Sequence, residues 1–160
     1  MIRRATADDV PAIVGLIYEL AEYEKARHEC HVTAAQLQTA LFGPNPALYA
    51  HVVEVDGEII GTAVWFLNYS TWDGVHGIYL EDLYVTPGQR GAGHGKALLA
   101  ALARECVDNN YSRLSWAVLN WNAPSIAFYD SLGAAPQDEW TTYRLSGTEL
   151  TDLASQVPRG

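Results

Sequence analysis

Apolar and polar residues follow two different periods along this chain, and together the two periods predict a mixture of helices and strands. Apolar residues recur at helical spacing over residues 10–21 and 97–107, a pattern typical of amphipathic helices. The segments 6–9 and 33–36 match the Thr-x-x-Asp/Gln capping box that begins a helix. The expected helices run to about Glu24, from Thr33 to Gly43, and over residues 97–107, 124–132 and 148–154.

Alternation of apolar and polar residues predicts strands in the rest of the chain. The segments 49–55 and 58–67 are joined by Asp56-Gly57, a dipeptide favoured in two-residue hairpin turns. Further strands are expected at residues 2–5, 78–85, 113–119 and 140–145. This order predicts the α/β class: a mixed sheet with an antiparallel meander, a right-handed parallel crossover after it, and helices on both faces. We expect residues 1–155 to form a single domain, followed by a tail at 156–160.

Composition and charge narrow the range of partners. The chain has 160 residues, 49% hydrophobic and 18% charged, and a net charge of −9. This charge argues against nucleic acid and anionic membranes and is compatible with a cationic substrate. There is no membrane-length apolar run or secretory signal, and the two cysteines suit a reducing compartment, so a cytoplasmic location is expected. His28 and His31 flank Cys30 at a spacing that matches no known metal site, and no metal is expected.

Residues 89–96, Gln-Arg-Gly-Ala-Gly-His-Gly-Lys, form a glycine-rich loop between a predicted strand and a predicted helix. Alternate glycines let the backbone approach a ligand closely, and the amides of a helix N-terminus favour negative charge. The loop is therefore expected to bind a pyrophosphate. It is not an NTPase phosphate loop, because Arg90 stands where the first glycine belongs and Ala97 follows Lys96. It also lacks the dinucleotide fingerprint, because the sixth residue counted from Gly91 is lysine.

The pattern that remains, Gln/Arg-x-x-Gly-x-Gly/Ala, resembles the pyrophosphate loop of the GNAT superfamily of acetyl-CoA-dependent N-acetyltransferases. Residues 79–85, Tyr-Leu-Glu-Asp-Leu-Tyr-Val, and 121–129, Trp-Asn-Ala-Pro-Ser-Ile-Ala-Phe-Tyr, resemble its spermidine/spermine and thialysine acetyltransferase branch. Residues 19–24 also match that branch, whereas Thr141 stands where its eukaryotic polyamine enzymes carry an acidic residue. The resemblance implies a GNAT-like fold with a mostly antiparallel sheet splayed at a CoA slot. It also implies acetyl-CoA as co-substrate and a homodimer.

The resemblance further implies which residues bind the co-substrate. Backbone groups of residues 83–85 would pair with the pantetheine arm as an added strand does, and one backbone amide there would polarise the thioester carbonyl. The loop would hold the pyrophosphate, and two positions at the start of the helix 124–132 match CoA contacts. The expected co-substrate residues are Leu83, Tyr84, Val85, Arg90, Gly91, Ala92, Gly93, His94, Gly95, Lys96, Asn122 and Ser125.

Acetyl transfer needs one group that receives the amine proton and one that protonates the leaving thiolate. The resemblance assigns these roles to Glu81 and Tyr129, respectively. A carboxylate can take the proton of an amine with a pKa of about 10.4, and a phenol with a pKa of about 10 can protonate a thiolate. Neighbouring residues of a strand face opposite sides, so Glu81 and Asp82 are expected to separate, with one at the slot.

The acceptor amine is expected to lie beside an aromatic and acidic group of side chains, because tyrosine rings and carboxylates both attract cations. The resemblance makes Tyr23, Glu24 and Glu81 the candidates for this group. Trp116, in the middle of the predicted strand 113–119, is a further candidate that could line the slot.

The sequence thus favours an N-acetyltransferase that moves acetyl directly, in a ternary complex, onto the primary amine of a diamine, polyamine or lysine-like acceptor. No Gly-x-Ser-x-Gly nucleophile motif is present, and direct transfer requires none. Two alternatives stay open: a protein or peptide N-acetyltransferase of the same fold, and a CoA-binding sensor without turnover. The presence of both Glu81 and Tyr129 favours an enzyme over a sensor.

Overall fold

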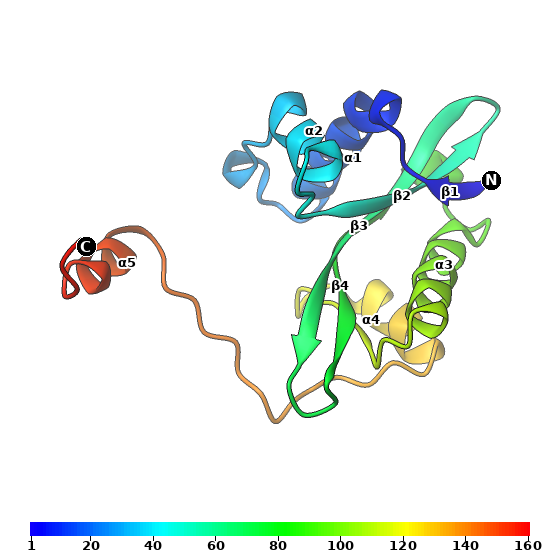
Figure 1. Cartoon of the computed structure of the whole chain (residues 1–160). Coiled ribbons are helices and arrows are strands. Elements are labelled where there is room, and N and C mark those ends of the chain that lie inside the picture. Colours follow the sequence, from blue (N-terminus) through cyan, green and yellow to red (C-terminus); the bar gives the residue numbers. More distant parts are fainter. The chain divides into compact units, whose positions relative to one another are not determined.

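The computed structural model describes residues 1–160 and divides into two compact units, Met1–Leu119 and Asn120–Gly160. The first unit is built on a five-stranded sheet in the spatial order β1-β2-β3-β4-β5 (Figure 1). Neighbouring strands are antiparallel from β1 to β4, and β5 is parallel to β4. The predicted meander and parallel crossover are therefore confirmed. The strands are β1 (Ile2–Arg4), β2 (Tyr49–Val55), β3 (Glu58–Ser70), β4 (Val75–Val85) and β5 (Leu114–Ser115).

Helices cover both faces of this sheet (Figure 1). Val52 and Val53 are neighbours in β2 and so point to opposite faces, yet both are 0% exposed. Val52 packs in a cluster with residues of α1 and α2, while α3 contacts β1 to β4 through an apolar stripe that includes the buried Leu98 and Leu102. These helices are α1 (Val10–Tyr23), α2 (Ala34–Phe42) and α3 (His94–Asp108), with single 3-10 turns at Ala7–Asp9, Arg27–Glu29 and Pro87–Gln89.

The turn and cap signals of the sequence are confirmed in the first unit. Asp56 and Gly57 have left-handed φ angles of 51° and 82° and join β2 to β3 as a two-residue hairpin turn. The backbone N–H of Thr6 donates to the Asp9 carboxylate over 2.7 Å ahead of α1. Thr33 caps α2 by accepting from the third backbone N–H of that helix over 3.1 Å.

One extra residue interrupts the ladder between β3 and β4. Val64 lies opposite Asp82 and Trp65 lies opposite Leu80, so Glu81 has no partner on β3 and forms a β-bulge. A bulge bends its strand and raises the local twist. Main-chain N–H and C=O groups alternate in direction along a strand. The extra residue shifts this alternation by one, so residues of β4 that would face one neighbouring strand face the other side after Glu81.

The strands β4 and β5 part close to this bulge. They pair only at Ile78–Leu114 and Tyr79–Ser115, so β5 is much shorter than the predicted strand 113–119. The chain leaves β4 after Ser115, and residues 80–85 of β4 have no ladder partner on that side. The first unit therefore has an open edge along the second half of β4.

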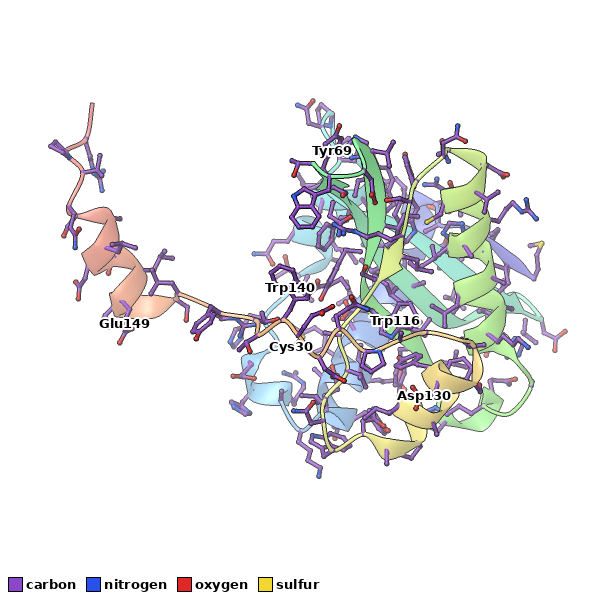
Figure 2. The ribbon with its side chains drawn as sticks, turned by 90° about the horizontal axis from the view of Figure 1, so that it is seen from below. Cys30, Tyr69, Trp116, Asp130, Trp140 and Glu149 are labelled. Carbon is purple, nitrogen blue, oxygen red and sulfur yellow. The ribbon has the colours of Figure 1, made fainter.

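The second unit holds α4 (Ala123–Ser131) and α5 (Gly147–Ala154). Gly133, with a φ of 84°, follows α4 in the left-handed conformation that glycine adopts readily after a helix. The prediction of a strand at 140–145 is wrong, because this segment is in neither helix nor strand. Its residues Trp140 and Tyr143 are 72% and 92% exposed, and Figure 2 labels Trp140. Alternation makes a strand only where a neighbouring strand takes up the hydrogen bonds.

None of the helices in the structure combines the length and the apolar character that crossing a bilayer requires.

His51 of β2 is a buried histidine with a polar partner at each ring nitrogen. Trp65 Nε1 donates to His51 Nδ1 over 3.1 Å, and His51 Nε2 lies 3.6 Å from Glu105 Oε1. Arg4 binds the same carboxylate, with its Nε 2.9 Å from Oε1. Burial, followed by the charge of Arg4, lowers the pKa of His51, and Glu105 acts in the opposite direction. The native imidazole therefore stays neutral at a pH where unfolded histidine takes up a proton.

His51 gives the free energy of unfolding a pH dependence of its own: its contribution is expected to fall as the pH is lowered from about 7 to 5, because unfolded His51 is protonated more readily than native His51. His51→Gln can still accept the Trp65 hydrogen bond and should flatten this dependence. His51→Phe leaves the indole N–H without an acceptor and should cost about 1–3 kcal/mol near neutral pH. Urea unfolding at both pH values measures these effects. Identical pH dependence in wild type and His51→Gln would contradict this role for His51.

Candidate functional site

The main-chain groups of Leu83 and Val85 face away from β3, toward the open edge of β4. The backbone N–H of Thr86 donates to the carbonyl of Ile60 over 2.9 Å, so the main chain of Thr86 faces β3. Main-chain directions alternate along a strand, and Tyr84 therefore faces β3 as well. The two neighbours of Tyr84, Leu83 and Val85, present their N–H and C=O groups on the other side, where no strand pairs with them.

The bulge at Glu81 sets this direction. Before it, the N–H of Ile78 donates to the carbonyl of Arg113 over 2.9 Å, so even-numbered residues face β5. The extra residue reverses the parity, and odd-numbered residues face that side after it. One of the groups, the carbonyl of Val85, accepts a hydrogen bond from Arg90 Nε over 2.9 Å. An extended ligand with amide groups could pair with the others as an added strand does.

The glycine loop follows β4 directly and leads into α3. Gly91 and Gly93 have left-handed φ angles of 86° and 83°, and Gly93 is the residue before the first helical one. A Cβ atom at either position would meet no atom within 4 Å, so backbone conformation, not space within the protein, calls for glycine here. The first intrahelical bond runs from the N–H of Ala97 to the carbonyl of Gly93. The amides before Ala97 are left to an outside acceptor, which is the arrangement that binds phosphates.

Three carboxylates gather where the bulge meets the end of α1. Burial raises the pKa of Asp82 to about 6, and the charges of Glu81 and then Glu24 add to the rise. Burial also raises the pKa of Glu24, which is the residue after α1. The separation of Glu81 and Asp82 to opposite faces stays a prediction: Glu81 is exposed and Asp82 is half-buried, and the bulge interrupts the strand between them and the residues before. The group concentrates negative charge that a cation would neutralise.

The two aromatic residues predicted to bind the acceptor amine also lie in the first unit. The side chain of Tyr23 is 38% exposed, and its ring centre lies 5.4 Å from the guanidinium carbon of Arg90. Trp116 is half-buried and comes directly after β5, not in the middle of a strand as predicted (Figure 2). Tyr84 buries its side chain and turns its main chain to β3, so it offers less to a ligand at the open edge than its two neighbours do.

The remaining predicted site residues belong to the second unit. Asn122 is buried and caps α4, because its Oδ1 accepts from the backbone N–H of Ser125 over 3.4 Å. Tyr129 is half-buried on α4, with its ring centre 5.5 Å from that of Phe128. The cap fixes the start of the helix that carries Tyr129.

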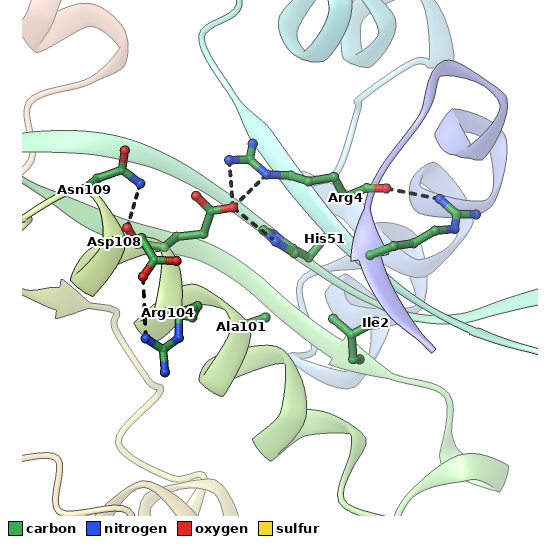
Figure 3. A pocket seen from close by; sticks show the side chains of 9 residues that line it. Ile2, Arg4, His51, Ala101, Arg104, Asp108 and Asn109 are labelled. Carbon is green, nitrogen blue, oxygen red and sulfur yellow. Dashed lines mark hydrogen bonds and ion pairs between the residues drawn. The ribbon is translucent and has the colours of Figure 1, made fainter.

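A cavity of about 450 Å³ in the first unit lies between β1, β2 and α3 (Figure 3). Its charged groups have ion-pair partners: Arg4 pairs with Glu105 over 2.8 Å and Arg104 with Asp108 over 3.5 Å within the lining, and Arg3 pairs with Asp9 over 2.7 Å outside it. His51 also lines it. None of the predicted site residues does, so this cavity is not part of the candidate site.

Comparison with known proteins identifies the family. The acetyltransferase (GNAT) family model matches residues 15–134, which include the open edge of β4, the glycine loop and α4. The chain belongs to the GNAT acetyltransferase family. GNAT acetyltransferases use acetyl-CoA as co-substrate, and this family member is accordingly an acetyl-CoA-dependent acyltransferase that acts on an amine.

Curated and solved relatives agree with this assignment. This chain is 36% identical over 167 residues to thialysine N-epsilon-acetyltransferase of Bos taurus, and the match covers 98% of each protein. It is 34% identical to spermidine/spermine N(1)-acetyltransferase-like protein 1 of Homo sapiens, covering 96% of this chain and 23% of that one. An integron cassette protein from V. cholerae superposes with a TM-score of 0.81 at 25% identity, covering 96% of both chains. The predicted mixed α/β GNAT fold is therefore confirmed.

The geometry of the first unit fits acetyl-CoA. The open edge of β4 offers main-chain donors and acceptors to a pantetheine arm, which carries amide groups. The glycine loop and the free amides of α3 suit its pyrophosphate. Sequence reasoning missed two features that matter here: the bulge that turns Leu83 and Val85 outward, and the contact between Arg90 and Tyr23. Neither has a local sequence signal, because each depends on residues far apart in the chain.

Proposed function

We propose that this acetyltransferase transfers acetyl from acetyl-CoA to the primary amine of a small acceptor that carries a second positive charge: a diamine, a polyamine or a lysine-like molecule. The observation that carries the proposal is the group of Glu24, Glu81 and Asp82 beside the open edge of β4. The raised pKa of Asp82 reflects carboxylates crowded in a partly buried place. A polycationic ligand would relieve this repulsion, and a partly buried ion pair is worth more than an exposed one.

Two further observations support a cationic acceptor. Two of the relatives are named for thialysine and for spermidine or spermine, molecules with more than one amine. The chain has a net charge of −9, which attracts a cation from a distance. Tyr23 and Trp116 are the aromatic side chains we assign to the acceptor side, where their faces would add to the attraction for a cation.

We assign the chemistry as direct transfer. Glu81, directly or through a water molecule, takes a proton from the acceptor ammonium group. The neutral nitrogen attacks the thioester carbonyl, whose oxygen is polarised by a backbone N–H of the open edge. The new C–N bond forms as the C–S bond breaks, and Tyr129 gives its phenolic proton to the leaving thiolate. As the amide forms, its nitrogen loses its remaining extra proton, which returns to the Tyr129 phenolate, and Glu81 releases its proton to solvent. The products are the acetylated amine, CoA and one proton.

The co-substrate is assigned to residues of both units. Leu83 and Val85 pair with the pantetheine arm, residues 90–96 hold the pyrophosphate, and Asn122 and Ser125 contribute from the start of α4. We infer that residues 1–155 act as one domain with a tail at 156–160; the family match over 15–134 spans parts of both units.

We also infer a cytoplasmic homodimer. The second unit exposes large apolar side chains that a second copy could cover: Trp140, Tyr143, Leu145, Leu150 and Leu153. Sedimentation equilibrium reports this state directly.

An assay of thiol release from acetyl-CoA tests the acceptor. A diamine is expected to give a higher kcat/KM than a monoamine of equal length. Glu24→Gln should raise the KM for the diamine by about three- to tenfold and leave the monoamine almost unchanged. High salt should reduce this effect. Glu22→Gln, the same change of charge at an exposed position of α1, is the matched control.

In the same assay, Glu81→Gln should lower kcat at neutral pH and recover in part at high pH, where the amine loses its proton unaided. A preference for the monoamine, or for neutral or anionic acceptors, would defeat the dicationic acceptor and leave acetyl transfer intact. Peptide acceptors as the best substrates would favour the protein acetyltransferase, and no turnover with any amine would favour the sensor.

Tyr129→Phe keeps the ring and removes the proton. The turnover rate should fall by roughly 10²- to 10⁴-fold, the usual effect of losing a general acid. Acetyl-CoA affinity, measured by calorimetry, should change little. Tyr69→Phe makes the same change at an exposed tyrosine of β3 and should have no effect. A Tyr129→Phe enzyme within twofold of wild type would show that Tyr129 only packs.

A further inference from the structure

Arg90, which stands directly before the first glycine of the loop, is held from two sides. Its Nε donates to the carbonyl of Val85 over 2.9 Å. Its guanidinium carbon lies 5.4 Å from the ring centre of Tyr23 and 5.2 Å from that of Tyr84. Both distances lie within the roughly 6 Å range of cation–π attraction. One hydrogen bond and two aromatic rings therefore fix the planar head group.

Tyr84 is the rigid part of this arrangement. Its side chain is only 7% exposed, and its hydroxyl interacts with the carboxylate of Glu19 in α1 as well as with Arg90. Tyr23 is the last residue of α1 and is far more exposed. Arg90 thus connects the start of the loop to the end of α1. Of the two rings that contact Arg90, that of Tyr23 is the one that can be replaced without disturbing the core.

The head group of Arg90 is free of carboxylate partners. It takes part in none of the ion pairs of the structure, and its partners are the Val85 carbonyl, the Tyr84 hydroxyl and the two rings. A guanidinium binds phosphate through N–H donors in a fixed planar fork, so the direction in which the fork is held determines how well it binds. A lysine ammonium has neither the fork nor the Nε bond.

We propose that Tyr23 is a positioning residue for acetyl-CoA, because its ring holds the Arg90 guanidinium in the direction in which it binds the phosphates of the co-substrate. This inference rests on the proposed phosphate role of residues 90–96. Tyr23 then serves both substrates: it faces the acceptor and supports the co-substrate through Arg90. Acetyl-CoA affinity therefore depends on a residue of the acceptor side even when no acceptor is present.

Calorimetric titration of acetyl-CoA into the full chain, without acceptor, tests this. Tyr23→Leu should weaken binding by about two- to fivefold, the effect of one cation–π contact, and Tyr23→Phe, which keeps the ring, should restore it. Arg90→Ala should weaken binding by about ten- to hundredfold. In the Arg90→Ala background, Tyr23→Leu should cause no further loss, because the two changes remove one shared interaction. Tyr69→Leu, at an exposed tyrosine of β3, is the matched control and should bind as wild type does.

The outcomes separate the inference from the proposed function. Wild-type affinity in Arg90→Ala would remove the phosphate role of this residue, and the inference with it. A weakened Arg90→Ala together with wild-type affinity in Tyr23→Leu would overturn the inference alone. Equal losses from Tyr23→Leu in both backgrounds would also overturn it, because Tyr23 would then act independently of Arg90. Arg90→Lys supplies a second route: it keeps the charge without the fork, and wild-type affinity in this variant would contradict the proposal.

Discussion

The β-bulge at Glu81 is the constraint on which the candidate site depends. A single unpaired residue reverses the alternation along β4, and the reversal turns the main-chain groups of Leu83 and Val85 from β3 to the open side. The same distortion lies two residues beyond the last pair between β4 and β5, so the groups that turn outward find no strand to receive them. Unpaired main-chain groups are costly when buried, and a ligand that pairs with them gains what a sheet edge normally gains from another strand.

The bulge also sets the charge of the acceptor side. It leaves Glu81 exposed and brings Asp82 into a partly buried place near Glu24, where burial is the main cause of the raised pKa of Asp82. Such a group opposes folding at neutral pH, because it is more easily protonated in the native state than in the unfolded one. A site that keeps charges in this unfavourable state is poised to bind a cation. Structure, charge and family thus converge on an amine acceptor.

Features encoded within a few residues could be predicted from the sequence. The Asp56-Gly57 turn and the caps at Thr6 and Thr33 depend on local backbone preference, and all are confirmed. The glycine loop was recognised for the same reason. Three features depend on contacts between residues far apart in the chain: the bulge, the short β5 and the contact between Arg90 and Tyr23. The alternation of apolar and polar residues along the sequence does not reveal such contacts. The segment 140–145 shows the opposite case: it has the sequence pattern of a strand but no neighbouring strand to pair with, and it forms none.

Residue-resolved amide hydrogen exchange, recorded by NMR with and without acetyl-CoA, reports whether the bulge opens the edge of β4 to the co-substrate. We expect the amides of Leu83 and Val85 to exchange quickly in the free protein and to become protected when acetyl-CoA binds. The amides of Asp82 and Tyr84, already bonded to β3, should be protected in both states. Bound acetyl-CoA without new protection at Leu83 and Val85, or with new protection at Asp82 and Tyr84 in their place, would contradict the role given to the bulge.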